Sequence, residues 1–532
     1  MTSIRTTICA VLVAGLAIPA ASQHVETLDV RVIQVPVLVY RGAEPVRGLT
    51  RDDFELIVNG KRAPIAYFDV LEFGENRSTG AEAVPPRDQR RLTMIVFDAS
   101  PMDLLRARPA VERLVGMGGA GEFFAIGMYD GREIRYLTNF TRDRRALVRA
   151  LATMEPSAAR DPFALAITVQ ERSAVADPSA SRSAEAGGFS DELFTEIEDF
   201  ERAITSSRND RGTMARAEAG MRRHQEWLEQ IEAESWASAL TAIADDLVPL
   251  EGIKQVILVS GAASLGLPRT NVIGNLHRSF RRAGATLHVV DLNGLRAPGN
   301  ASSRGPSANY RTPDILFRAA LGTGGRVIAT GPEVAARILS RTSSITYLLG
   351  FRPPSSERDG WNDIAIKVKS QPWFTSVSHR KGYAAGSAAV RSVGNVFLAD
   401  AMLHDLPVSE LTVTILAPGE GVIEVGVPSD ELLEWAIDDR MTVDFYIYIF
   451  DAAGEVAGWR QRRMRIDASA ARSALRGAEL VRRERFAIPS GRFTAKALVH
   501  IVERGMLGFR RLEFDVELPP RDEGLVSERS KE

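Results

Sequence analysis

The chain has 532 residues, of which 45% are hydrophobic and 25% charged, values typical of a folded globular protein and not of a disordered one. Its formal net charge of −2 excludes a protein that binds nucleic acid or an anionic membrane through bulk positive charge. The length is that of about three domains.

Residues 1–22 have the layout of a secretory signal peptide. Arg5 precedes an apolar stretch over residues 8–18, and small residues follow up to Ser22. The stretch is too short to span a bilayer comfortably, so we expect cleavage near Ser22, with an uncleaved anchor as the alternative. The product is then exported, periplasmic or extracellular, without a transmembrane span. Cys9, the single cysteine, lies inside this segment, so the mature protein would contain no thiol.

Residues 24–75 are predicted to form an N-terminal β-domain. Apolar residues alternate along this stretch, and Asn59-Gly60 is a typical two-residue hairpin turn between two strands. Pro36 favours an edge strand or a bulge, because proline donates no ladder hydrogen bond. Residues 76–91, polar with a Pro pair, are interpreted as a linker.

Residues 92–385 alternate between short apolar strands and segments of helical spacing. This pattern predicts the fold class α/β, with a doubly wound, mostly parallel sheet and a helical insertion at about 190–250. From residue 391 to 518 the period returns to two, which predicts a C-terminal antiparallel β-sandwich. Residues 519–532 form a polar tail.

Several motifs in this order resemble exported bacterial proteins with a VWFA-related acidobacterial domain. The resemblance is carried by PVRGLTRDDFELIVNGKRAPIAYF, GIKQVILVSG, GATLHVVDLNGL, TGGRVIATG, SSITYLLGFRPP and HRKGYAA, over roughly residues 25–385. Asp98-Ala99-Ser100 resembles the opening of the Asp-x-Ser-x-Ser motif of von Willebrand factor A (VWA) domains. The resemblance implies a VWA-like α/β domain that binds a partner, and it supplies no established activity.

A VWA metal site holds Mg²⁺ or Mn²⁺ through hard oxygen donors, and this chain departs from the motif. Asp98 and Ser100 match, but Met102 occupies the second serine position, and thioether sulfur is a poor ligand for a hard cation. No threonine precedes Thr168 in the second loop, and Gly261 occupies the position of the third-loop aspartate. Substitute donors are Ser260, Ser264, Asp103 and Asp161. We therefore expect a degenerate metal-ion-dependent adhesion site (MIDAS) without a cofactor, in which Asp98 caps a helix that begins near Pro101. Weak Mg²⁺ or Mn²⁺ binding is the alternative.

Three functions are compatible with these patterns. The first is an exported, non-enzymatic binding or scaffold protein, whose partner is another protein or a cell-envelope component. The second is metal-dependent adhesion through Asp98 and Ser100. The third is a hydrolase using Ser260 and His288, for which the Gly-x-Ser-x-Gly elbow and the usual Ser–Asp–His order are missing.

Two basic clusters and several aromatic residues have a structural interpretation and a functional one. The sequences RDQRR at 87–91 and RQRRMR at 460–465 are interpreted as solvated faces in preference to nucleic-acid patches. Trp227, Trp236, Tyr446 and Tyr448 are interpreted as core and sheet-face residues, with partner anchoring as the alternative.

Overall fold

The computed structural model describes residues 32–73, 86–98, 101–119, 121–129, 134–153, 230–231, 233–260, 270–292, 314–353, 360–369, 375–385, 393–406, 409–419, 421–437, 439–474 and 477–516. The predicted signal peptide, linker residues 76–85, insertion residues 190–229, Ser100 and the tail lie outside these residues. None of the described helices is both long and apolar enough to span a bilayer.

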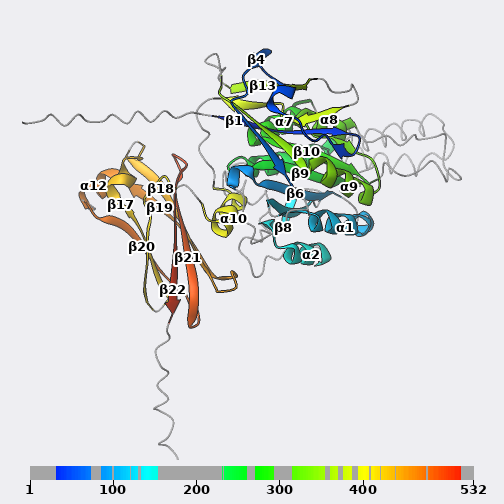
Figure 1. Ribbon diagram of the computed structural model, residues 1–532. Helices are drawn as coiled ribbons and strands as arrows, with labels where there is room; N and C mark the ends of the chain where they lie inside the picture. Colours follow the sequence, from blue (N-terminus) through cyan, green and yellow to red (C-terminus); the bar gives the residue numbers. More distant parts are fainter. Residues whose placement is uncertain are drawn as a thin grey trace, which may run out of the picture.

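Two antiparallel sheets at the N-terminal side enclose one hydrophobic core (Figure 1). The first sheet has the order β14-β1-β12-β5, with β2 paired to β1, and the second has the order β15-β13-β3-β4. The strands are β1 (Ile33–Arg41), β2 (Glu44–Pro45), β3 (Phe54–Val58), β4 (Lys61–Ala63), β5 (Tyr67–Glu72), β12 (Ile345–Phe351), β13 (Gly360–Val368), β14 (Ser376–His379) and β15 (Gly382–Ala385). This core therefore combines the start of the chain with strands from residues 345–385, which the sequence analysis had assigned to the α/β domain.

Local patterns in β1 and β3 explain their geometry. Alternate residues of β1 from Ile33 to Val39 face the core, as their period of two predicts. The predicted hairpin turn is confirmed, because Asn59 and Gly60 both have positive φ values, of 50° and 78°, and connect β3 to β4. Pro36 lies in an interior strand, against expectation. The pairing of β1 with β14 begins only at Val37, so the absent N–H of Pro36 removes no hydrogen bond to β14.

The middle of the chain forms a six-stranded mixed sheet with the order β11-β10-β9-β6-β7-β8. Its strands are β6 (Arg91–Asp98), β7 (Glu122–Tyr129), β8 (Ile134–Thr141), β9 (Ile253–Ser260), β10 (Ala285–Asp291) and β11 (Val327–Ile328). Neighbouring strands from β11 to β7 are parallel, whereas β8 is antiparallel to β7. The strands expected from their apolar runs are present.

Helices pack on both faces of this sheet. One face contacts α1 (Pro101–Gly116), α2 (Arg144–Thr153) and α9 (Pro332–Ser343). The other contacts α7 (Thr270–Ala283), α8 (Asp314–Thr323) and the helical residues 233–247, which confirm the end of the predicted helical segment. Trp236 is 1% exposed in this second core, as the structural interpretation predicts. The start of α1 at Pro101 is also confirmed.

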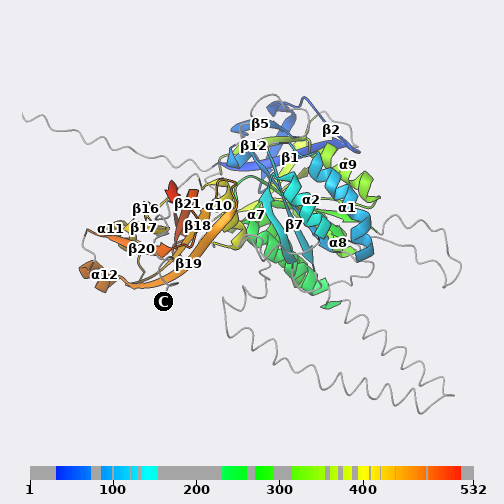
Figure 2. The same ribbon diagram turned by 90° about the horizontal axis from the view of Figure 1, so that it is seen from below.

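The C-terminal part is built from two antiparallel sheets around a hydrophobic core of their own (Figure 2). Their orders are β16-β17-β20 and β19-β18-β21-β22. The strands are β16 (Thr414–Gly419), β17 (Val422–Pro428), β18 (Arg440–Phe450), β19 (Val456–Asp467), β20 (Glu479–Arg485), β21 (Gly491–Ile501) and β22 (Met506–Val516). Short helices α11 (Ser429–Leu433) and α12 (Ala468–Ala474) lie at their ends.

The predicted fold class is wrong for this chain. Strand residues outnumber helical ones in the described part, and four of its five sheets are purely antiparallel. A doubly wound, mostly parallel domain over residues 92–385 is not what the structure shows, since parallel pairs are confined to the mixed sheet. The physical reason is that β12, β13 and β14 find antiparallel partners near the N-terminus, a long-range pairing that local periodicity does not encode.

Candidate functional site

Three polar side chains lie in a row at the carboxyl ends of β6, β9 and β10. Ser260 is in register with Asp98 on one side and with Asp291 on the other. All three lie on the same sheet face, because the residues two positions earlier, Val96, Leu258 and Val289, belong to one hydrophobic cluster. The carboxyl ends of parallel strands are where such sheets bind ligands, so this row is the candidate site.

The row is tied together by hydrogen bonds. The Ser260 hydroxyl donates to Asp98 Oδ2 at 3.1 Å, and the backbone N–H of Leu292 donates to the Ser260 carbonyl at 2.9 Å. Ser260 is 1% exposed and Asp291 is fully buried, whereas Asp98 is partly exposed. Asp98 is therefore the solvent-accessible end of the row, and the Ser260 hydroxyl helps to hold it in place.

The donors described at this edge fall short of a complete cation site. Asp98, Ser260 and Asp291 supply oxygen atoms of the type that Mg²⁺ accepts, but Mg²⁺ requires near-octahedral coordination. No group of three or more His, Cys, Asp or Glu residues suited to a metal occurs among the described residues. Met102 and Asp103 lie in the first turn of α1. Ser100, Asp161, Thr168, Gly261 and Ser264 lie outside the described part of the chain.

The predicted hydrolytic pair is not brought together. His288 precedes Asp291 by three residues on β10, and its side chain lies on the face opposite to that of Ser260. The Ser260 hydroxyl donates to Asp98 on one face of the sheet. The His288 side chain lies on the other face. Among the described residues, the Ser260 hydroxyl is therefore hydrogen-bonded to Asp98 and not to His288.

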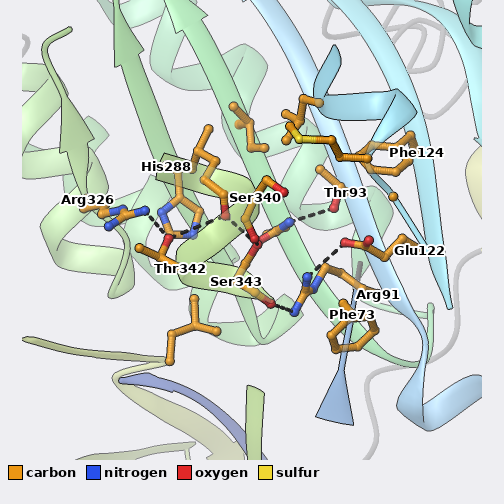
Figure 3. Close-up of a pocket in the computed structure, with 17 residues that line it drawn as sticks. Phe73, Arg91, Thr93, Glu122, Phe124, His288, Arg326, Ser340, Thr342 and Ser343 are labelled. Atoms are coloured by element: carbon orange, nitrogen blue, oxygen red, sulfur yellow. Dashed lines mark hydrogen bonds and ion pairs between the residues drawn. The ribbon is translucent and has the colours of Figure 1, made fainter. Parts of the chain in front are cut away.

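His288 lies in a small polar cavity of about 20 Å³ beneath α1 and α9 (Figure 3). Burial, together with the nearby Arg326 and Arg91 guanidiniums, lowers the pKa of His288 to about 3. The side chain is 2% exposed and therefore neutral at ordinary pH. A buried, neutral histidine beside two cations contributes to the packing of this region. It is a poor proton acceptor at neutral pH.

Arg91 organises the same cavity. Its guanidinium contacts Glu122 at 2.9 Å and the Thr346 hydroxyl at 2.7 Å, and it also donates to the Ser343 carbonyl. It stacks on Phe73, with 3.7 Å between the guanidinium carbon and the ring centre. Arg91 thereby links the mixed sheet to β12 of the N-terminal sheets. Figure 3 shows Arg91 beside Phe73, Glu122 and Ser343.

A second buried pair joins the mixed sheet to α10 (Asn395–His404). Arg90 donates to both carboxylate oxygens of Asp400 at 2.7 Å, and both side chains are 1% exposed. Arg87 contacts the same carboxylate at 3.3 Å. The prediction that residues 87–91 form a solvated face is therefore wrong. The missed signal was Asp400 within an otherwise apolar helix, since a buried carboxylate needs a cationic partner.

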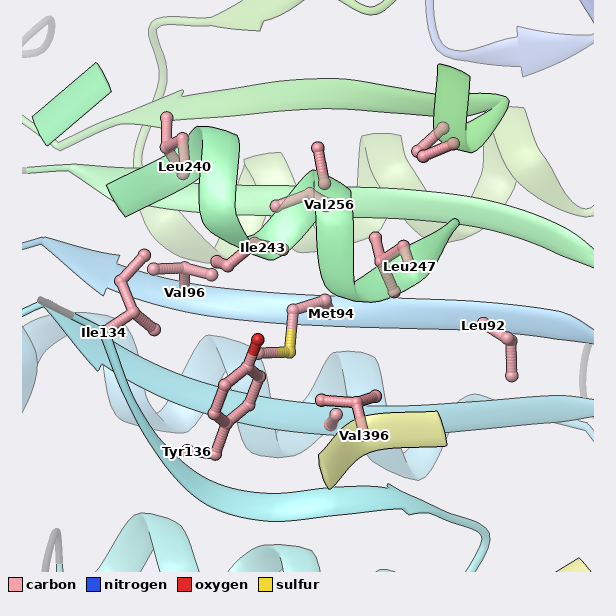
Figure 4. Close-up of a cluster of buried hydrophobic side chains, with 14 of the residues drawn as sticks. Leu92, Met94, Val96, Ile134, Tyr136, Leu240, Ile243, Leu247, Val256 and Val396 are labelled. Carbon is pink, nitrogen blue, oxygen red and sulfur yellow. The ribbon is translucent and has the colours of Figure 1, made fainter. Parts of the chain in front are cut away.

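Helix α10 is buried on nearly all sides between the mixed sheet and the C-terminal sheets. Its residues Val396 to Met402 are buried, and the stretch Val396 to Ala399, with Met402, belongs to the same cluster as Tyr446, Tyr448 and Leu498 of β18 and β21. Figure 4 shows α10 contributing Val396 to the cluster that contains Met94 and Tyr136. Tyr446 and Tyr448 are thus core residues of this junction, as their structural interpretation predicts.

Comparison with known proteins defines no family for this chain. No protein-family model matches it, and no curated protein matches. Solved structures share only fragments with it. The chicken interferon gamma receptor alpha chain aligns at 12% identity and a TM-score of 0.15, over 30% of this chain and 66% of the receptor chain. A glycosyl hydrolase family 2 member from Bacteroides cellulosilyticus aligns at 6% identity and a TM-score of 0.13, over 32% of this chain and 20% of its own.

An endonuclease/exonuclease/phosphatase from Beutenbergia cavernae gives 13% identity and a TM-score of 0.13, over 34% of this chain and 39% of its own. The chain spans less than two thirds of each of these three structures. At such TM-scores the similarities carry no argument about fold or function. The fold and the candidate site define the class only as a mostly β protein with one mixed, helix-covered sheet.

Proposed function

We propose that the chain is an exported, non-enzymatic scaffold that binds a protein or cell-envelope partner at the carboxyl-end edge of the mixed sheet. The observation that carries the proposal is the single hydrophobic cluster that runs from the mixed sheet through α10 into β18 and β21. A core shared across regions holds them in one orientation, and a fixed orientation is what a scaffold requires.

The polar row supplies the contact surface in this proposal. Asp98 is partly exposed and held by Ser260, so it presents a pre-positioned carboxylate to a partner. The separation of Ser260 from His288 favours binding over hydrolysis. The sequence resemblance to VWFA-related proteins also implies binding, and it stays a prediction. Export rests on the signal-like residues 1–22.

A photo-crosslinking amino acid in place of Ala329 tests the proposed contact edge. Ala329 is exposed and directly follows β11, whose carboxyl end lies beside that of β10, so a partner at this edge comes within reach of the probe. The matched control carries the same probe in place of Arg62, whose side chain is 82% exposed on β4. We expect a discrete adduct with envelope material from position 329 and none from position 62. Equal adducts from both positions, or none from position 329, would contradict the proposal.

Metal-dependent adhesion is the second candidate, favoured by the alignment of Asp98, Ser260 and Asp291. Its test is thermal unfolding of the protein without residues 1–22 in Mn²⁺, in Mg²⁺ and in EDTA, beside Asp98→Ala. A ligand that binds only the native state raises its stability, so an occupied site shifts the midpoint. We expect no cation-dependent shift in the parent. A shift of several degrees that disappears in Asp98→Ala would instead establish adhesion through a cation.

A further inference from the structure

Arginines from two strands that belong to different sheets converge at one edge of the C-terminal sheets. Arg460 and Arg462 lie on β19, and Arg482 lies on β20. All three point to the carboxylate of Glu484, with nitrogen–oxygen distances of 4.0 Å from Arg460, 3.0 Å from Arg462, and 2.7 Å from Arg482 Nε. We call these four residues the arginine seam (β19 and β20 in Figure 1).

The charge of the seam is not balanced. In the described part of the chain, Glu484 is the one carboxylate that pairs with these three guanidiniums, and it neutralises one of them. Its side chain is 8% exposed. Arg460 and Arg462 remain 42% and 48% exposed. Since the whole chain has a net charge of −2, this surplus of positive charge is local.

The seam also has a regular geometry. Residues i and i+2 of a strand point to the same side of the strand and are about 6.6 Å apart. Arg460 and Arg462 are therefore spaced by this distance along β19. An extended peptide with acidic residues at every second position repeats at the same interval. Both β19 and β20 are the outermost strands of their sheets in the described part of the chain, where a peptide has room to lie alongside.

We propose that the arginine seam binds an extended acidic segment of a partner protein. Guanidinium groups form paired hydrogen bonds with carboxylates, and the common spacing lets successive acidic side chains meet successive arginines. This surface goes beyond the proposed contact edge at Asp98, and neither depends on the other. The sequence alone does not predict this surface, because RQRRMR alternates across one strand and Arg482 is supplied by a different sheet.

Fluorescence anisotropy with a labelled synthetic peptide that alternates Glu and Thr tests the proposal. The full protein is expected to bind this peptide, and to bind a block peptide of the same composition more weakly. Binding should weaken as salt rises. The double variant Arg462→Gln/Arg482→Gln should weaken it about tenfold or more, and Arg483→Gln should weaken it less, because Arg483 lies on the opposite side of β20.

Arg492→Gln is the matched control, because Arg492 is 73% exposed on β21 and lies outside the seam. It should leave peptide affinity unchanged, and circular dichroism checks that each variant folds. Absence of binding, equal binding of the two peptides, or equal weakening by Arg492→Gln would overturn the proposal. So would tighter, Arg462-dependent binding of duplex DNA, a sulfated glycan or anionic lipid vesicles, since each of these would assign the seam to a different class of partner. Crosslinking at position 329 reports on the other surface, so the two proposals fail separately.

Discussion

Individual charged residues decide how the parts of this protein are joined. Arg90 and Asp400 are separated by 310 positions in the chain, yet they form a two-pronged ion pair that is almost completely buried. Each charge is costly to bury alone and tolerable only beside the other. The pair therefore specifies where α10 docks on the mixed sheet.

Removing one member of this pair should be costly. Asp400→Ala leaves Arg90 buried without its carboxylate, and we expect a loss of about 3–5 kcal/mol in the free energy of unfolding, measured by urea denaturation. The double variant Arg90→Met/Asp400→Leu removes both charges and should lose less than Asp400→Ala alone. A double variant as unstable as the single one would show that the pair contributes through packing and not through charge.

At the scale of elements, Lys254 of β9 caps the C-terminal end of a neighbouring helix. Its Nζ donates to the carbonyls of Leu247 and Leu250, at 3.1 and 2.7 Å, at the end of helical residues 233–247. Unpaired carbonyls at a helix end attract a cation. Burial and the Arg380 and Arg90 guanidiniums oppose the charge and lower the pKa of Lys254 to about 7.

This lowered pKa makes stability depend on pH. Between about pH 7 and the ordinary lysine value of 10.5, the unfolded chain binds more protons at Lys254 than the folded chain does. The free energy of unfolding should therefore rise as the pH increases from 7 to 9. Lys254→Met should reduce that slope, whereas the exposed control Lys367→Met should not. Denaturation at several pH values measures this slope. An unchanged slope in Lys254→Met would contradict the assignment of the pH dependence to Lys254.

Element boundaries in the interior were largely predictable. The apolar runs that mark β6, β7, β9 and β10 are long enough to bury a strand on both faces, and Pro101 marks the start of α1. The prediction for Pro36 was wrong because an interior strand tolerates a proline where the neighbouring strand does not pair with it. Where that pairing begins depends on β14 and not on β1.

At the scale of the whole molecule, α10 acts as a shared core element. Phe397 is 4% exposed within the cluster that spans the mixed sheet, α10 and the C-terminal strands. We expect the protein without residues 1–22 to unfold in one calorimetric transition, because no part can leave without exposing this core. Phe397→Ala should cost about 3–5 kcal/mol and should split the transition.

Val334→Ala on α9 is the control, because Val334 is 43% exposed and its truncation creates no cavity. It should leave the calorimetric trace almost unchanged. Two separate transitions in the parent protein would show that the C-terminal sheets fold independently, and the scaffold proposal would lose its main support.

By itself, the sequence determined the local features of this protein: where strands and helices begin, the Asn59-Gly60 turn, the alternation within β1, and the polar residues Asp98, Ser260 and Asp291 at strand ends. These depend on side-chain size, backbone freedom and periodicity, which act over a few residues. Only the tertiary structure decided that β12 to β15 join the N-terminal sheets, that Arg90 meets Asp400, that Ser260 and His288 lie on opposite faces, and that arginines of β19 and β20 converge on Glu484. Each of these depends on contacts between residues distant in the chain, whose free energy becomes available only when the segments pack together.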